Sequence, residues 1–474
     1  MRKLFCALLL CSMLGATAAA TPALASPSET VYFEAPKELL SSNATREKTI
    51  ATLRTLGVHA LRVQLFWRNV APAARSSRRP SFDATNPANY NWGQYAAVLA
   101  EAHALHWSIL LTVTSPVPTW ATAGHRDKLG ITRPDDREFQ QFMTAVGREF
   151  GSQVALYAIW NEPNHPRFLR PQFNAKGLPA SPRIYRGLFQ AGYEGLKAAG
   201  MASPKVLFGE TAPGGETRIN PREGLLKDVA PLVFLREALC LNNGYGKAGT
   251  CSALHASGYA HHAYSMRAAG PFYTPPGKDN VTIGVLSRLS QALDRAAAAH
   301  AINSNLPIYL TEFGVESKPN KYLGVSVGQQ AEYDAISEKI AYQNPRVASF
   351  SQYLMRDDPL SGVGASGGVG FQTGIAYLNG ARKPLYFGFP IPLVVTKRGR
   401  GYSLWGLVRP ATGDTQLTVF VKPPHSRRFR KLRLVTTNGS GSWSLNSQAA
   451  GSVWRVQWRS PNGATYNGPA IHAY

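Results

Sequence analysis

Two glutamates in the sequence each follow an apolar run and could carry acid–base chemistry. Glu162 lies in the stretch YAIWNEPN at residues 157–164, where the run stops in a carboxylate flanked by two amides and a proline. Glu312 ends a second run, PIYLTEFG, about 150 residues later, and Glu316 is a weaker rival one turn farther out. Glycosidic cleavage needs two such carboxylates, because one donates a proton to the leaving oxygen while the other attacks the anomeric carbon.

Other polar and aromatic side chains stand at the ends of apolar runs and would surround these carboxylates. Asn161 can hydrogen-bond a sugar hydroxyl beside the reacting carbon. Tyr264 can donate to Glu312, and Arg62 can keep Glu312 ionised or can form a buried ion pair of purely structural value. The remaining candidates for binding a sugar are His262, Glu210 and Tyr353 and, as stacking platforms, Trp67, Trp120 and Trp160.

Several of these candidates have a structural interpretation that the sequence leaves open. Glu210 could pair with a nearby arginine instead of lining a cleft. His261 and His262 are adjacent, and at most one should face the site, because side chains alternate along a strand. Trp67 and Trp120 could equally pack a lid over the site.

The elements that must position these residues alternate between strand and helix from about residue 30 to residue 392. This alternation predicts a parallel sheet, and the near-continuous apolar character of the strands predicts burial on both faces. Eight units predict a (β/α)8 TIM barrel, whose strand ends form the active site. A doubly wound sheet is the alternative, but Glu34-Ala-Pro stands where its glycine-rich loop would be. The predicted strands are 31–34, 60–67, 108–115, 155–161, 205–210, 258–264, 307–313 and 347–353, and the predicted helices include 45–56, 92–106, 135–150, 184–200, 282–300 and 326–343.

The texture changes after residue 392, so we expect two domains: a catalytic barrel at 29–392 and a small all-β sandwich at 393–474. Short strands at 402–408, 415–421, 431–436 and 453–458 are separated by Gly, Pro, Asn and Ser. The second region holds twelve Lys and Arg against one acid, Asp414. Its basic cluster at 427–433 is either a solvated face or an attachment site for an anionic cell-wall polymer.

The first 25 residues have the pattern of a secretory signal peptide. A basic start at Arg2 and Lys3 precedes a short apolar core, and Ala23-Leu24-Ala25 fits a cleavage site. No later stretch resembles a membrane span, so we expect a secreted protein without a membrane partner. Export makes a disulfide between Cys240 and Cys251 plausible, with two free thiols as the alternative.

The stretches YAIWNEPN and PIYLTEFGVES resemble the two signatures of clan A glycoside hydrolases, most closely families 5 and 39. The resemblance implies a retaining enzyme on a (β/α)8 barrel, with Glu162 as acid/base and Glu312 as nucleophile. It also implies that Asn161 binds the sugar 2-hydroxyl and that His262 and Tyr264 line the reactive subsite. One feature departs from the clan, because Tyr353 stands where a tryptophan platform usually follows strand 8.

The sequence therefore favours a secreted retaining glycoside hydrolase that acts on a carbohydrate substrate without a metal or organic cofactor. A retaining enzyme would place the two carboxyl groups about 5–5.5 Å apart. A non-catalytic carbohydrate-binding or wall-binding protein is the alternative. Nucleic-acid binding is disfavoured despite the 51 Lys and Arg against 28 Asp and Glu, because no basic–aromatic strand motif accompanies the charge. The sugar, the linkage, exo or endo action and transglycosylation stay open.

Overall fold

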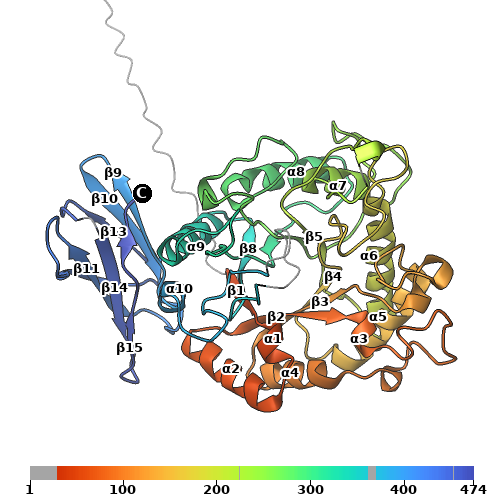
Figure 1. Cartoon of the computed structure of the whole chain (residues 1–474), viewed down its shortest axis with the longest axis horizontal. Coiled ribbons are helices and arrows are strands. Elements are labelled where there is room, and N and C mark those ends of the chain that lie inside the picture. Colours follow the sequence, from red (N-terminus) through yellow and green to blue (C-terminus); the bar gives the residue numbers. More distant parts are fainter. Residues whose placement is uncertain (1–28, 224, 361–369, 452) are drawn as a thin grey trace, which may run out of the picture.

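The computed structural model describes residues 29–223, 225–360, 370–451 and 453–474, so the predicted signal peptide at 1–25 lies outside the described residues. Eight parallel strands close into a barrel in chain order, and β8 pairs with β1 (Figure 1). The predicted barrel is therefore confirmed. Its strands are β1 Thr30–Glu34, β2 Ala60–Phe66, β3 Ser108–Thr114, β4 Leu156–Ile159, β5 Val206–Thr211, β6 Gly258–His261, β7 Ile308–Leu310 and β8 Val347–Tyr353.

Helices surround the barrel, and the six predicted ones are all present within a few residues of their expected ends. Polar caps fix several of their starts: Asp135 accepts from the backbone of Glu138 at the start of α5, and Ser326 forms a capping box with Gln329 at the start of α9. The α-helices are α1 Pro36–Leu39, α2 Asn43–Thr55, α3 Trp67–Val70, α4 Gly93–Ala104, α5 Asp136–Phe150, α6 Ser181–Ala198, α7 Pro231–Ala238, α8 Ser287–Ala298, α9 Val327–Tyr342 and α10 Pro384–Gly388.

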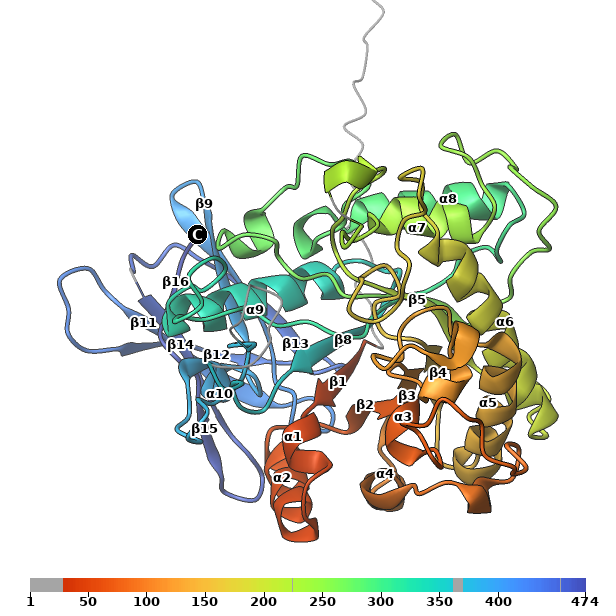
Figure 2. The same cartoon turned by 45° about the vertical axis from the view of Figure 1, so that its right-hand side comes forward.

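The C-terminal region consists of two antiparallel sheets that lie beside α9 and α10 (Figure 2). One sheet has the order β13-β10-β9, and the other has β12-β11-β14-β15 with β16 on β14. A shared apolar core that includes Val395, Leu404, Val419 and Trp454 fills the space between them. The strands are β9 Leu393–Arg398, β10 Gly401–Leu407, β11 Gln416–Lys422, β12 Arg430–Thr436, β13 Ser442–Ser447, β14 Val453–Arg459, β15 Thr465–Asn467 and β16 Ile471–His472.

Polar contacts join this region to the barrel. Arg409 forms an ion pair with Glu338 of α9, in which its Nη2 donates to both carboxylate oxygens and both side chains are buried. Tyr466 donates to the carbonyl of Thr55 (2.7 Å).

The predicted disulfide between Cys240 and Cys251 is confirmed, with a Cα–Cα distance of 6.1 Å. It closes a loop between α7 and β6. Within the described ranges, every helix is too short or too polar to span a lipid bilayer.

Candidate active site

The loop after β4 presents Glu162 at the barrel mouth through an unusual backbone. Trp160 and Glu162 both have left-handed φ values, 70° and 40°, which non-glycine residues seldom adopt. Hydrogen bonds from neighbouring strand ends hold this conformation: Asn161 N donates to Thr114 Oγ1 (3.0 Å), and Glu162 N donates to the carbonyl of Glu210 (2.9 Å). The strained turn therefore belongs to a rigid, multiply anchored loop.

The two amides that flank Glu162 have separate tasks. Asn161 accepts from Arg62 Nη2 through its Oδ1 (2.7 Å), so it belongs to the site. Asn164 donates to the carbonyls of Ala212 and Val229 and accepts from Ala212 N (2.8 Å). This second amide holds the loop after β4 against the segment after β5 and so fixes the position of the Glu162 carboxylate at the barrel mouth.

Glu312 follows β7 and is 5 % exposed. Arg62 Nη1 donates to its Oε2 (2.8 Å), and Tyr264 Oη donates to its Oε1 (2.8 Å). These two hydrogen bonds fix the orientation of the carboxylate. The structure therefore makes both of the contacts that the sequence suggested for this residue.

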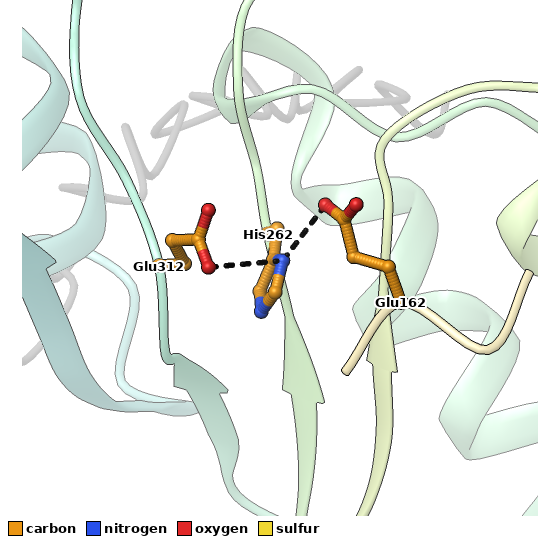
Figure 3. A group of neighbouring side chains, drawn as sticks. All are labelled: Glu162, His262 and Glu312. Carbon is orange, nitrogen blue, oxygen red and sulfur yellow. Dashed lines mark hydrogen bonds and ion pairs between the residues drawn. The ribbon is translucent and has the colours of Figure 1, made fainter. Parts of the chain in front are cut away.

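His262 lies between the two glutamates (Figure 3). Its Nδ1 is 2.9 Å from Glu162 Oε1 and 3.8 Å from Glu312 Oε2, while its Nε2 is 3.3 Å from Glu210 Oε2. Burial disfavours the imidazolium, but the charge of Glu312 and the hydrogen bonds to Glu162 and Glu210 outweigh it and raise the pKa of His262 to about 10. The ring is therefore cationic at neutral pH.

Glu162 and His262 share one hydrogen bond and titrate as a pair. Burial alone would raise the pKa of Glu162, but the hydrogen bond and positive charge of His262 prevail and lower it. The proton that the pair shares thus resides on Nδ1 of the ring, 2.9 Å from the carboxylate oxygen. His261 points elsewhere: it bonds Thr211 and the carbonyl of Val281, and burial lowers its pKa to about 4. Only His262 of the pair reaches the site, as strand alternation predicts.

Arg62 lies beneath the carboxylates and is hydrogen-bonded to several of them. Its side chain is fully buried and contacts Glu34, Glu210 and Glu312 in addition to Asn161. Glu210 is 0 % exposed, and its Oε2 is held by both Arg62 and His262, so the prediction that it binds substrate is wrong and the arginine-pair alternative holds. Its left-handed φ of 52° mirrors that of Glu162 at the neighbouring strand end.

The sequence reasoning missed Glu34 as a site residue. This side chain ends β1, bonds Arg62 Nη1 and accepts from Gln64 Nε2 (2.7 Å). Burial is the main influence on it, and despite the opposing charge of Arg62 the pKa of Glu34 rises to about 7. Its position at a strand end, like that of Glu162 and Glu312, was the available signal.

The predicted tryptophan platforms are corrected by the structure. Trp67 and Trp120 are each 1 % exposed, and their rings meet edge to face in the core. Trp67 also stacks on Phe142 of α5 at 4.9 Å. The reason is that β2 ends at Phe66 and Trp67 begins the short helix α3, which turns the indole away from the barrel mouth. Trp160 is buried as well, and its Nε1 donates to a backbone carbonyl.

Aromatic rings do line the site, but they come from β8 and from segments that follow β6, β7 and β8. Tyr264 lies between Phe313 and Phe371, with ring-centre distances of 5.9 and 6.2 Å. Tyr353 is half-buried and packs edge-on against Phe371. Burial and then the charge of Glu312 raise the pKa of Tyr353, which places it close to that carboxylate. Phe313 and Phe371 had not been predicted as site residues.

A cavity of about 470 Å³ opens at Glu162 and Tyr264. That size is typical of small-ligand sites. His165 and Asp228 stand beside Glu162 at its wall, 3.8 Å apart, and burial raises the pKa of Asp228 to about 6.

Glu162, His262 and Glu312 offer one ligand atom each within 4.8 Å of one another, which is also a geometry for a metal ion. The partners already present argue for acid–base chemistry instead. Arg62 and Tyr264 occupy the two oxygens of Glu312, and the cationic guanidinium and imidazolium would repel a metal cation.

Comparisons with known proteins agree with the fold. A glucosidase from Croceicoccus marinus superposes with a TM-score of 0.54 at 11 % identity, covering 92 % of this chain and 96 % of the other. A monomeric beta-xylosidase from Caulobacter crescentus CB15 gives 0.49 at 13 % identity over 91 % and 97 %. Xylanase 10B from Thermotoga petrophila RKU-1 gives 0.43 at 13 % identity over 76 % and 92 %.

No protein-family model and no curated protein matches the sequence. The chain thus has a barrel fold that glycosidases also use, with two carboxylates, a histidine and an arginine gathered at its mouth.

Proposed function

We propose that this protein is a retaining glycoside hydrolase in which Glu312 is the nucleophile and Glu162 the acid/base. The observation that carries the proposal is the meeting of these two carboxylates at the ends of β7 and β4. One oxygen of each lies within 4.8 Å of the other. This proximity supports the retaining spacing of about 5–5.5 Å over the inverting separation of about 6.5–9.5 Å.

In the first step Glu312 attacks the anomeric carbon and forms an ester with it, while the bond to the leaving oxygen breaks. Glu162 delivers a proton to that oxygen, drawn from the pair that it forms with His262. In the second step Glu162 takes a proton from water, the water oxygen attacks the anomeric carbon, and the Glu312 carboxylate leaves. Two inversions retain the anomeric configuration.

The supporting residues have roles that follow from their contacts. Arg62 and Tyr264 hold the Glu312 carboxylate in position, because both donate to it. With its Oδ1 held by Arg62, the amide Nδ2 of Asn161 would donate to the sugar 2-hydroxyl. Tyr353 would take the place of a tryptophan platform. We include export through the signal peptide at 1–25 in the proposal.

We propose a second role for the C-terminal sheets, attachment to an anionic polymer such as a cell-wall polysaccharide. Cross-strand pairing places Phe420 opposite both Arg455 and Lys431 on one face of the sheet. The Arg455 guanidinium lies over the rings of Phe420 and Phe429 at 5.6 and 4.5 Å. Among the described residues of 410–474, His472 is the one that forms an ion pair. The lysines and arginines of this face have no carboxylate partner in the part of the chain that the structure describes and can therefore bind an anionic partner. Retention of residues 1–474 on an anionic polysaccharide column, lost with charge-reversing changes here, would test it.

The hydrolase proposal is tested with a panel of aryl α- and β-glycosides. We expect chromophore release from one sugar, and we expect Glu312→Ala to abolish it. Azide should then restore turnover with an inverted glycosyl azide as product. Turnover that survives in Glu312→Ala without azide would contradict the assignment of the nucleophile.

A further inference from the structure

The cavity at the carboxylates continues into an arm that the catalytic steps do not use. From Glu162 and Tyr264 it runs past the end of β7 to Val325 and to Ser337 of α9. We call the part of the cavity lined by the segment that joins β7 to α9, and by α9 itself, the arm. A cavity of this volume next to a proton donor is a binding site for part of a substrate.

The walls of the arm are apolar. The rings of Phe313 and Phe371 form one side, and they flank the ring of Tyr264, whose hydroxyl bonds Glu312. The apolar surface thus begins beside the tyrosine that donates to Glu312, whereas Glu312 itself does not line the cavity. The other walls are formed by Met266, Pro271, Leu323 and Val325.

Polar side chains of the arm already have partners in the protein. Ser265 Oγ donates to the carbonyl of Arg267 (2.7 Å), and Ser337 Oγ donates to a carbonyl one turn earlier in α9 (2.7 Å). Glu316 accepts from the backbone of Gln372 through Oε2 (2.8 Å).

Three charged lining residues, Glu216, Lys227 and Arg267, are exposed and belong to the rim. Asp228 and His165 are half-buried, lie beside Glu162 and pair with each other at 3.8 Å. A second sugar would bury several hydroxyls here, and an unpaired buried hydroxyl is costly.

The arm also lies on a definite side of the bond that breaks. The ring attacked by Glu312 must sit over Arg62 and Asn161, where the polar groups are. Glu162, which protonates the leaving oxygen, stands where the arm begins. We infer that the arm is the leaving-group subsite and that the substrate is an amphiphilic glycoside, a sugar joined to an alkyl or aryl group. The inference rests on the proposed hydrolase and adds the class of leaving group.

The test compares methyl and n-octyl β-glucosides and β-xylosides with the disaccharides of the same sugars. A fully buried methylene strengthens binding about fourfold, so even partial burial of the octyl chain should raise kcat/KM at least tenfold over the methyl glycoside. Hydrolysis of octyl and methyl glycosides at equal rates, or a preference for the disaccharide, would overturn the inference while the hydrolase stands.

Met266→Gln probes the arm directly, because this half-buried side chain keeps its length while its thioether becomes an amide. We expect the octyl-to-methyl ratio of kcat/KM to fall at least threefold. Leu434→Gln, at a 49 % exposed position on β12, is the matched control and should leave that ratio unchanged.

Calorimetric titration with n-octyl β-glucoside separates the two proposals. Binding that Met266→Gln weakens, without hydrolysis of any glycoside, would support the apolar site and refute the hydrolase. Neither binding nor hydrolysis would refute both.

Discussion

Replacing Glu34 by glutamine should stabilise the protein at alkaline pH and leave its stability nearly unchanged at acidic pH. Burial raises the pKa of Glu34 from its ordinary value of 4.5 to about 7, so the folded state binds a proton that the unfolded state releases. The stability that the neutral Glu34 carboxyl contributes is therefore fully present below about pH 4.5 and is lost as the pH rises through 7. A shift of this size corresponds to about 3 kcal/mol.

Glutamine has the same shape as the neutral acid and can still accept from Arg62, but it never ionises. We expect Glu34→Gln to be more stable than the wild type by about 1–3 kcal/mol at pH 8. The lower end allows for the neighbouring carboxylates, which share Arg62 and adjust to the change. At pH 4.5 the difference should be close to zero.

Urea unfolding followed by tryptophan fluorescence at pH 4.5, 6 and 8 measures this difference. Glu47→Gln makes the same chemical change on the exposed surface of α2 and controls for general effects of charge. A stability difference for Glu34→Gln that is equal at pH 4.5 and pH 8, or that favours the wild type at pH 8, would refute the reasoning.

Three further predictions concern catalysis and stability. His262→Gln should move the alkaline limb of kcat/KM, expected near pH 10 in the wild type, more than one unit lower, because the pair loses its imidazolium; a pH profile from 5 to 11 checks this. Glu162→Ala should lower kcat/KM about 100-fold or more for alkyl glycosides but far less for dinitrophenyl glycosides, which leave without a proton; equal losses would contradict its role as acid. Changing Cys240 and Cys251 to serine should lower the free energy of unfolding by about 3 kcal/mol for a loop of this length and leave kcat unchanged.

The site was predictable wherever strand ends determine position. Carboxyl ends of parallel strands meet at one face of a barrel, so Glu162 and Glu312 had to approach each other once both were recognised as strand ends. Arg62 lies inside β2 and not at its end, so it meets the carboxylates from below, where β2 neighbours β1 and β3. Glu34 satisfies the argument equally well, because its strand was predicted to end there, but no motif marked this glutamate as part of the site.

The aromatic residues were less predictable because burial depends on packing between distant segments. If β2 were one residue longer, Trp67 would extend the strand toward the barrel mouth. Because Trp67 instead begins α3, its ring lies in the core and stacks on Phe142. Phe371 reaches the site from a loop well beyond β8, and in a loop the spacing of apolar residues does not predict which side chains face the site. In the C-terminal sheets four strands, β9, β13, β15 and β16, were not predicted, because weak alternation hides short antiparallel strands.

The central claim, that Glu312 forms a covalent bond with the sugar, is tested most directly by trapping that bond. The protein is incubated with dinitrophenyl 2-deoxy-2-fluoro-β-glucoside and -xyloside, whose glycosyl-enzymes break down slowly, and is then digested and examined by mass spectrometry. The account predicts one added fluorosugar on the peptide that contains Glu312. A label on Glu34, Glu162 or Glu210, or turnover of the matching unsubstituted glycoside without any label, would contradict it.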